Sequence, residues 1–97
     1  MDTATRVRKL ASFEELAKMF DPEVHDALRG LTEGATHIVV YENLDLSSHW
    51  CGERTALKVG PGCGVQTLEE ALRGHLGDLP SQRQYPVAYL EVPNGAA

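Results

Sequence analysis

The chain has little cysteine, few aromatic residues and no long apolar run, and each shortage excludes a class of protein. Two cysteines among 97 residues are too few for a scaffold built on disulfides. No apolar segment approaches the roughly 18 residues that span a bilayer, and no basic start leads into an apolar stretch as in a secretory signal. The sequence therefore predicts a cytoplasmic protein without a membrane partner.

What remains is the composition of an ordinary folded domain, with 42% hydrophobic and 24% charged residues. This balance excludes a disordered chain, and the length predicts a single domain over residues 1–97. The net charge is −5. Residues 11–48 contain eight acidic and two basic side chains, whereas residues 1–10 contain three basic and one acidic. An acidic chain disfavours duplex nucleic acid, whose phosphates need Lys and Arg, and permits a basic protein partner.

The first half of the chain begins with a helical pattern. Ser12 and Glu15 form a capping box, and apolar residues then recur at helical spacing from Phe13 to Leu31. Asp21-Pro22 interrupts this stripe and suits the start of a new helix. The segment is therefore either two short helices or one helix kinked at Asp21.

Three segments rich in β-branched and aromatic residues predict strands. They lie at residues 37–44, 55–59 and 85–92. The short connection between the first two favours an antiparallel hairpin. Between the second and third, Thr67 caps a further helix whose apolar stripe extends to Leu79. Gly74 and Gly77 weaken and end this helix. Residues 1–11 form either an edge strand or a loose arm, and residues 93–97 form a loose tail.

This order predicts an α+β fold. We expect a two-layer sandwich of one or two N-terminal helices, a β-hairpin, a short helix and a final strand (α-β-β-α-β). The sheet would have three or four mainly antiparallel strands, with the helices on one face. The sheet face left uncovered would favour a homodimer.

The polar turn between the first two strands contains the only tryptophan. Trp and Arg are typical anchors of protein interfaces, so the ring either anchors a partner or folds back onto the sheet as a lid. The predicted interaction residues are Trp50, His49, Arg54 and Arg83.

The loop before the third helix is rich in glycine. Backbone amides in such a loop can hold an anion at a helix N-terminus. The Rossmann and Walker spacings are both absent, and a tight turn that needs positive φ is the simpler interpretation. The residues of this possible anion loop are Gly60, Gly62, Gly64 and Thr67.

Four histidine and cysteine side chains make a possible tetrahedral zinc site. They are His49, Cys51, Cys63 and His75. Their spacing does not match the compact zinc patterns. A disulfide or a cysteine nucleophile is also conceivable, but two free thiols in a reducing compartment are the simpler expectation.

No catalytic signature accompanies these residues, and no cofactor is predicted. The sequence favours a small acidic module that is not an enzyme and forms a homodimer. It would bind protein through the turn around Trp50 and the acidic helices, as an adaptor, inhibitor or accessory protein. The alternative is a domain that binds a small ligand or metal, or a small enzyme, which would use the His/Cys turn and the glycine loop.

Overall fold

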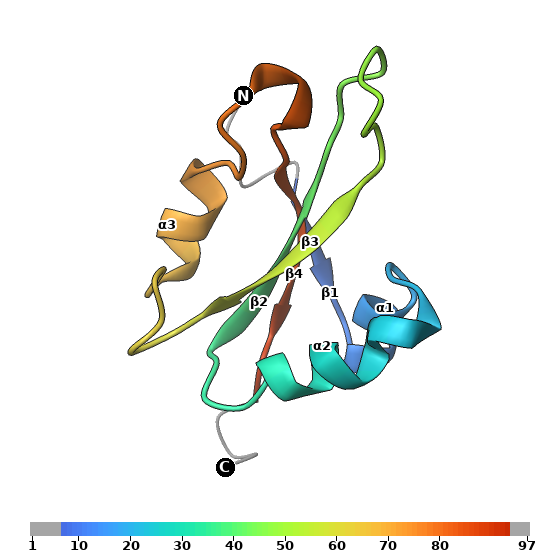
Figure 1. The fold of residues 1–97 in the computed structure, drawn as a ribbon. Coiled ribbons are helices and arrows are strands. Elements are labelled where there is room, and N and C mark those ends of the chain that lie inside the picture. Colours follow the sequence, from blue (N-terminus) through green and yellow to red (C-terminus); the bar gives the residue numbers. More distant parts are fainter. Residues whose placement is uncertain (1–6, 94–97) are drawn as a thin grey trace.

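A four-stranded mixed sheet runs through the computed structural model, which describes residues 7–93 (Figure 1). The strand order is β1-β4-β2-β3. The short β1 pairs in parallel with β4, and the other two pairings are antiparallel. The elements in chain order are β1 (Arg8–Leu10), α1 (Phe13–Ala17), η2 (Pro22–Val24), α2 (His25–Leu31), β2 (His37–Glu42), β3 (Arg54–Val59), α3 (Leu68–Arg73), η3 (Pro80–Gln82) and β4 (Tyr85–Glu91). The predicted α+β fold and the hairpin are confirmed.

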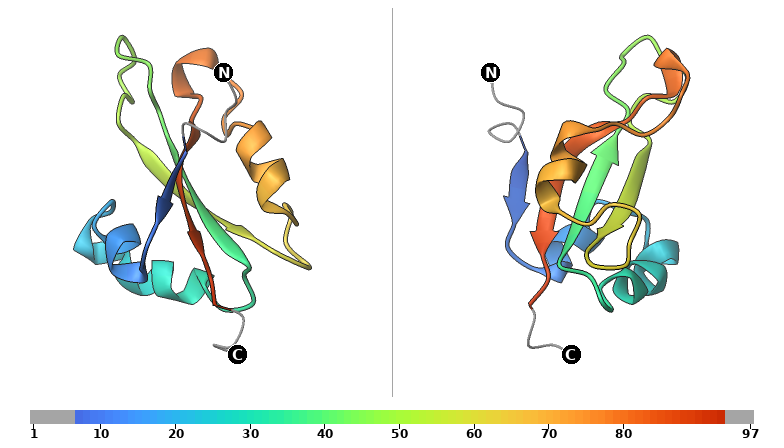
Figure 2. Two further views of the ribbon diagram at one scale, coloured as in Figure 1. Left: turned by 180° about the vertical axis from the view of Figure 1, so that it is seen from behind. Right: turned by 90° about the vertical axis from the view of Figure 1, so that its left-hand side faces the viewer.

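Strand β2 lies inside the sheet and is buried on both faces. Successive strand side chains point to opposite faces, so Ile38 and Val40 belong to one core cluster and Val39 and Tyr41 to another. Figures 1 and 2 show α1 and α2 on one face of the sheet and α3 on the other. The helices are thus divided between the faces, whereas the expected arrangement placed them all on one. An apolar strand with two buried faces requires cover on both.

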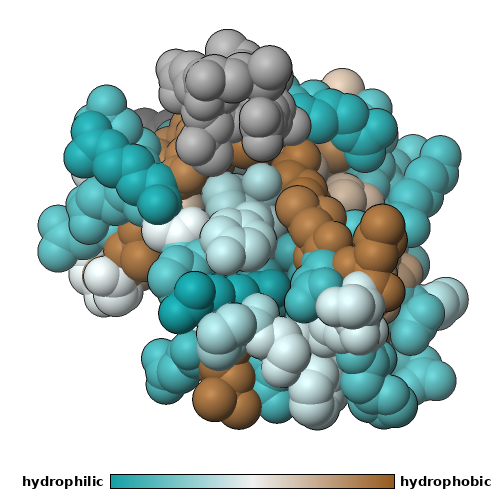
Figure 3. Space-filling view, turned by 90° about the horizontal axis from the view of Figure 1, so that it is seen from above, coloured by the Kyte–Doolittle hydropathy of each residue, from teal (hydrophilic) through white to brown (hydrophobic). Residues whose placement is uncertain are grey.

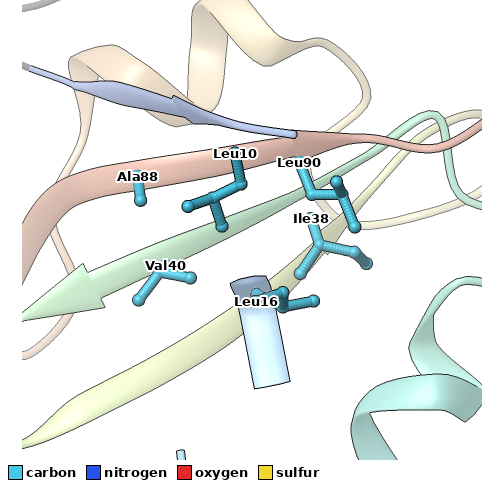
Figure 4. Packing of buried hydrophobic residues seen from close by; sticks show 6 residues of the cluster. All are labelled: Leu10, Leu16, Ile38, Val40, Ala88 and Leu90. Carbon is cyan, nitrogen blue, oxygen red and sulfur yellow. The ribbon is translucent and has the colours of Figure 1, made fainter. Parts of the chain in front are cut away.

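The larger core cluster joins four elements. Leu16 of α1 packs against Leu10 of β1, Ile38 and Val40 of β2, and two residues of β4, Ala88 and Leu90 (Figure 4). Phe13 and Leu31 pack at its margin. Their helices are too short to be stable in isolation, so their stability depends on this burial.

The first helical segment divides as its sequence pattern allowed. The Ser12 hydroxyl accepts a hydrogen bond from the Glu15 amide at 3.4 Å, and α1 ends at Ala17. Pro22 then begins η2, which leads directly into α2. The structure therefore has two separate helical segments and not one kinked helix.

The third helix is shorter than its apolar pattern suggests. The Thr67 cap is confirmed, because its hydroxyl accepts from the Glu70 amide at 3.2 Å. The helix ends at Arg73, however, and Leu76 forms two backbone hydrogen bonds with Gln84, both of 2.9 Å. Leu79 is 56% exposed. The predicted stripe to Leu79 is therefore wrong beyond Arg73, and the helix already ends at Gly74, the first of the two glycines expected to weaken and end it.

At the chain ends, β1 confirms the edge-strand alternative for part of residues 1–11. Most of the predicted tail at 93–97 lies outside the described residues. Among residues 7–93, no helix is both long and apolar enough to cross a bilayer.

One buried hydrogen bond fastens α3 to the sheet. The Tyr41 hydroxyl donates to the backbone oxygen of Ala71 at 2.5 Å. That carbonyl is among the last four of α3, which have no partner within a helix. Burial also raises the pKa of Tyr41 from its ordinary value of 10.0. The single hydroxyl therefore serves as a C-terminal cap for α3.

We expect Tyr41→Phe to lower the free energy of unfolding by about 1–3 kcal/mol, because it leaves a buried carbonyl without its donor. Urea unfolding followed by circular dichroism measures this loss. Tyr89→Phe is the matched control, since Tyr89 is only partly buried beside the same cluster. An equal loss in the two variants would contradict the capping role.

The raised pKa of Tyr41 also fixes the sign of a pH effect. A group whose pKa is raised on folding contributes stability that is complete below its unfolded pKa and is lost as the pH rises toward its folded pKa. The wild type should therefore lose stability above pH 10, and Tyr41→Phe should lose less over the same range.

Candidate functional site

Two loops meet at one end of the sheet, shown at the top of Figure 1. They are the hairpin loop, residues 43–53, and the connection from α3 to β4, residues 74–84. Asn43, which is 1% exposed, donates from its side-chain amide to the backbone oxygen of Ser81 at 2.8 Å. The Ser48 hydroxyl donates to the same oxygen. We call this pair of bonds the Ser81 contact; it joins segments more than 30 residues apart in the chain.

The hairpin loop is also ordered by its own side chains. Asp45 accepts hydrogen bonds from the amide and the hydroxyl of Ser47, at 3.0 and 2.7 Å. These bonds hold the pKa of Asp45 below its usual range, first through the hydroxyl and then through the amide. The Trp50 amide donates to the Ser48 hydroxyl at 3.0 Å. The loop backbone is therefore fixed before any partner binds.

Most of the large exposed hydrophobic residues lie in these two loops or directly beside them. Among residues 7–93 there are six such side chains, and five belong to this end; Val24 is the sixth. Leu46 is 92% exposed. Figure 3 looks onto this end and shows apolar residues in separate groups between hydrophilic ones. We call the five the apical residues: Leu44, Leu46, Trp50, Leu79 and Tyr85.

The predicted interaction residues divide into two kinds. Trp50 is 40% exposed, and its ring is nearly perpendicular to that of His49, with 5.5 Å between the centroids. Arg54 is already engaged, because its Nε pairs with Glu42 at 2.6 Å and its Nη1 donates to the Met19 carbonyl at 2.8 Å. Arg54 therefore holds β3 to the chain after α1, whereas Trp50 and His49 are available to a partner.

The fourth predicted residue, Arg83, lines a pocket of about 720 Å³ between α3, the hairpin loop and β4. A smaller pocket of about 290 Å³ lies beside Trp50 and Gln84. Among the described residues, two buried side-chain polar atoms lack a hydrogen-bond partner: Arg83 Nε and Gln84 Oε1. Both atoms belong to this end of the sheet. They are exceptions, because buried polar groups in proteins ordinarily have a hydrogen-bond partner.

The possible metal ligands do not converge. His49 and Cys51 lie in the hairpin loop, and Cys63 lies beyond the opposite end of β3. His75 instead contacts the Tyr85 ring, with 5.8 Å between centroids. Both cysteines are free. Within residues 7–93, no three His, Cys, Asp or Glu side chains are placed to hold a metal ion.

The glycine loop has the geometry of a tight turn. The Gly60 amide donates to the Val65 carbonyl, and the Cys63 amide to the Gly60 carbonyl, both at 3.1 Å. A Cβ on Gly60 would lie 3.1 Å from the Thr36 amide nitrogen, so this backbone approach requires glycine. Gly62 and Gly64 have open space around them. Two loop amides are thus used internally.

The helix after this loop is also poorly suited to an anion. The Thr67 hydroxyl caps its first turn, and Glu69 and Glu70 lie in that turn. Two carboxylates already interact favourably with the positive end of the short helix and would repel an added anion. The geometry favours the turn interpretation of Gly60, Gly62, Gly64 and Thr67.

The acidic helices occupy a different part of the molecule from Trp50. Figures 1 and 2 show α2 toward the end of the sheet opposite the hairpin loop. The exposed acidic residues of this segment are Glu14, Asp21, Glu23, Asp26 and Glu33. The predicted combination of the Trp50 turn with the acidic helices is therefore not one continuous site.

Four of the five apical residues were not identified from the sequence as exposed binding residues. The buried Asn43 was also not identified as the residue that joins the two loops. Leu44 reads as the end of a strand and Leu79 as part of a helical stripe. Gly77, which was expected to end the helix, and Pro80 flank Leu79, and together they indicate that Leu79 lies outside the helix. Nothing in the sequence signals that the carbonyl of Ser81 receives two side chains.

Comparison with known proteins does not assign the chain to a family: no family model, curated protein or solved structure matches it.

We expect Gly77→Ala to disrupt the 74–84 loop. Gly77 has φ +91°, and an added Cβ would lie 2.8 Å from the Gln82 carbonyl oxygen. Gly62→Ala is the matched control, because Gly62 has φ +83° with open space around it. The control should cost about 1–2 kcal/mol of unfolding free energy, the usual cost of this backbone region. Gly77→Ala should cost clearly more in urea unfolding, and equal losses would contradict the close packing.

Proposed function

We propose that this domain is a protein-interaction module, not an enzyme, that binds through the apical residues, and that its partner is a second copy of the chain. The observation that supports this function is the placement of the exposed hydrophobic residues. Five of the six large ones among residues 7–93 belong to one end of the sheet, outside both core clusters. Exposed hydrophobic residues spread over a whole surface need no explanation, whereas five of them at one end, although in separate groups there, favour a contact surface at that end.

The energetics favour association at this end. Full burial of a leucine or aromatic side chain contributes about 1.5–3 kcal/mol relative to exposure. The Ser81 contact fixes the two loops that bear these side chains, so little ordering entropy is lost on binding. Tryptophan, the residue type of Trp50, is also enriched among the residues that anchor protein interfaces.

The reason for a homodimer differs from the one that the sequence suggested. Helices cover both faces of the sheet, so no bare face requires a second copy. The proposal relies instead on a self-complementary contact between apical residues, as in a two-fold symmetric dimer. A cytoplasmic location is part of the proposal, and the two free, well-separated cysteines are compatible with a reducing compartment.

We expect Leu46→Ser and Trp50→Ala each to weaken self-association by tenfold or more, because each removes apolar area from the contact. Sedimentation equilibrium over a range of protein concentrations measures the dissociation constant. Val24→Ser is the control, since Val24 is an exposed hydrophobic residue away from this end. It should dimerise as the wild type does.

A wild-type protein that remains monomeric at about 0.5 mM would contradict the second copy as partner, since useful dimers bind far more tightly. Dimers that persist unchanged in both apical variants would contradict the apical surface. Far-UV circular dichroism confirms that each variant is folded.

A further inference from the structure

We propose that the pocket lined by Arg83 binds a small organic anion: a carboxylate or phosphate monoester attached to an apolar group. This inference goes beyond the proposed function and does not depend on it. The pocket lies between the end of α3, the hairpin loop and the start of β4. Its volume of about 720 Å³ falls within the range typical of small-molecule sites.

Arg83 is the residue that would recognise the anion. It lines the pocket and makes no side-chain hydrogen bond or ion pair within residues 7–93. Its Nε is buried without an acceptor, which is costly for a donor on a charged group. The guanidinium presents its donors in a planar fork that matches two oxygens of a carboxylate or phosphate. Because the Nε is closed to solvent, an anion in the pocket would be bound by the terminal Nη groups of the same guanidinium.

The neighbouring charges concentrate positive potential in an otherwise acidic chain. Arg73 also lines the pocket. Arg73 has a weak, exposed pairing with Glu69 at 3.5 Å, which leaves its charge accessible. A hollow lined by charges of one sign raises the local concentration of the opposite ion.

Asp45 is the opposing group in the lining. Its hydrogen bonds from Ser47 lower its pKa and keep it ionised, so it repels an anion. Two arginines against one carboxylate leave the balance with the cations. Removing the Asp45 charge should therefore strengthen anion binding.

The rest of the lining is apolar and defines the remainder of the ligand. It includes Leu72 of α3 and two residues of β4, Pro86 and Val87. The Tyr85 ring, held 5.8 Å from the His75 ring, provides a flat surface. An inorganic ion would leave these walls in water, whereas a ligand with an apolar or aromatic group would cover them.

The test is titration of the full chain, labelled with nitrogen-15, with benzoate, phenyl phosphate and the uncharged benzamide, followed by NMR. Arginine Nε–H signals are resolved, so Arg83 reports directly. We expect saturable shifts at Arg83 and Tyr85 with one or both anions, with a dissociation constant of about 1 mM or lower. The anion that binds more tightly distinguishes a carboxylate from a phosphate ligand. Benzamide should bind at least tenfold more weakly.

Substitutions separate the pocket from general charge. Arg83→Gln should weaken anion binding about tenfold or more, whereas Arg29→Gln, the same charge change on α2, should leave it unchanged. Asp45→Asn keeps the side-chain oxygen that accepts from Ser47 and should tighten binding. Leu46→Ser, which should weaken the proposed dimer, should still bind the anion saturably, because Leu46 does not line the pocket.

The proposal would be overturned by the absence of saturable shifts up to about 20 mM anion. It would equally be overturned by benzamide binding as well as benzoate, or by Arg83→Gln binding as well as Arg29→Gln. The benzamide comparison uses the wild type alone, so it remains decisive if Arg83→Gln fails to fold.

Discussion

The structure depends on the burial of β2 on both of its faces. Ile38, Val39, Val40 and Tyr41 are successive residues, and none is more than 2% exposed. Because neighbouring side chains of a strand point in opposite directions, each face needs its own cover. The helices that supply this cover have five to seven residues, which is too few for independent stability. They are helical because β2 offers each of them an apolar surface.

The same constraint accounts for the loops at the end of the sheet. The helix over Tyr41 stops at Arg73, so the chain must travel back to β4 outside the core. That connection contributes little to either core cluster. It is positioned by polar bonds to one backbone oxygen, that of Ser81, and by the tight approach of Gly77 to Gln82. Apolar residues on it are therefore unnecessary to the fold, and this separation allows them to serve binding.

Much of the fold could be predicted from the sequence, because local patterns determine it. The caps at Ser12 and Thr67, the helix start at Asp21-Pro22 and the hairpin all follow from short-range chemistry. The apolar character of β2 on both faces was also readable, and it argued against placing all the helices on one side. Strand order was not readable, because it depends on contacts between residues that are distant in the chain.

The candidate site was predicted in parts. Trp50 and Arg83 stand out individually, but the bonds that join their two loops are not revealed by the sequence. Histidine and cysteine residues suggested a metal site by composition, yet β3 extends between Cys51 and Cys63 and keeps them apart. Residue types indicate what chemistry is available, whereas topology decides which residues meet.

The two proposed binding events share part of the surface. Leu44 and Tyr85 are apical residues and also line the Arg83 pocket. A partner that covers these side chains would alter the pocket wall, and an anion that orders them would alter the contact surface. Two ligands that share residues in this way have a coupling free energy, and each then changes the affinity of the other by the same factor. The sign depends on whether the partner closes the pocket over the anion or displaces it.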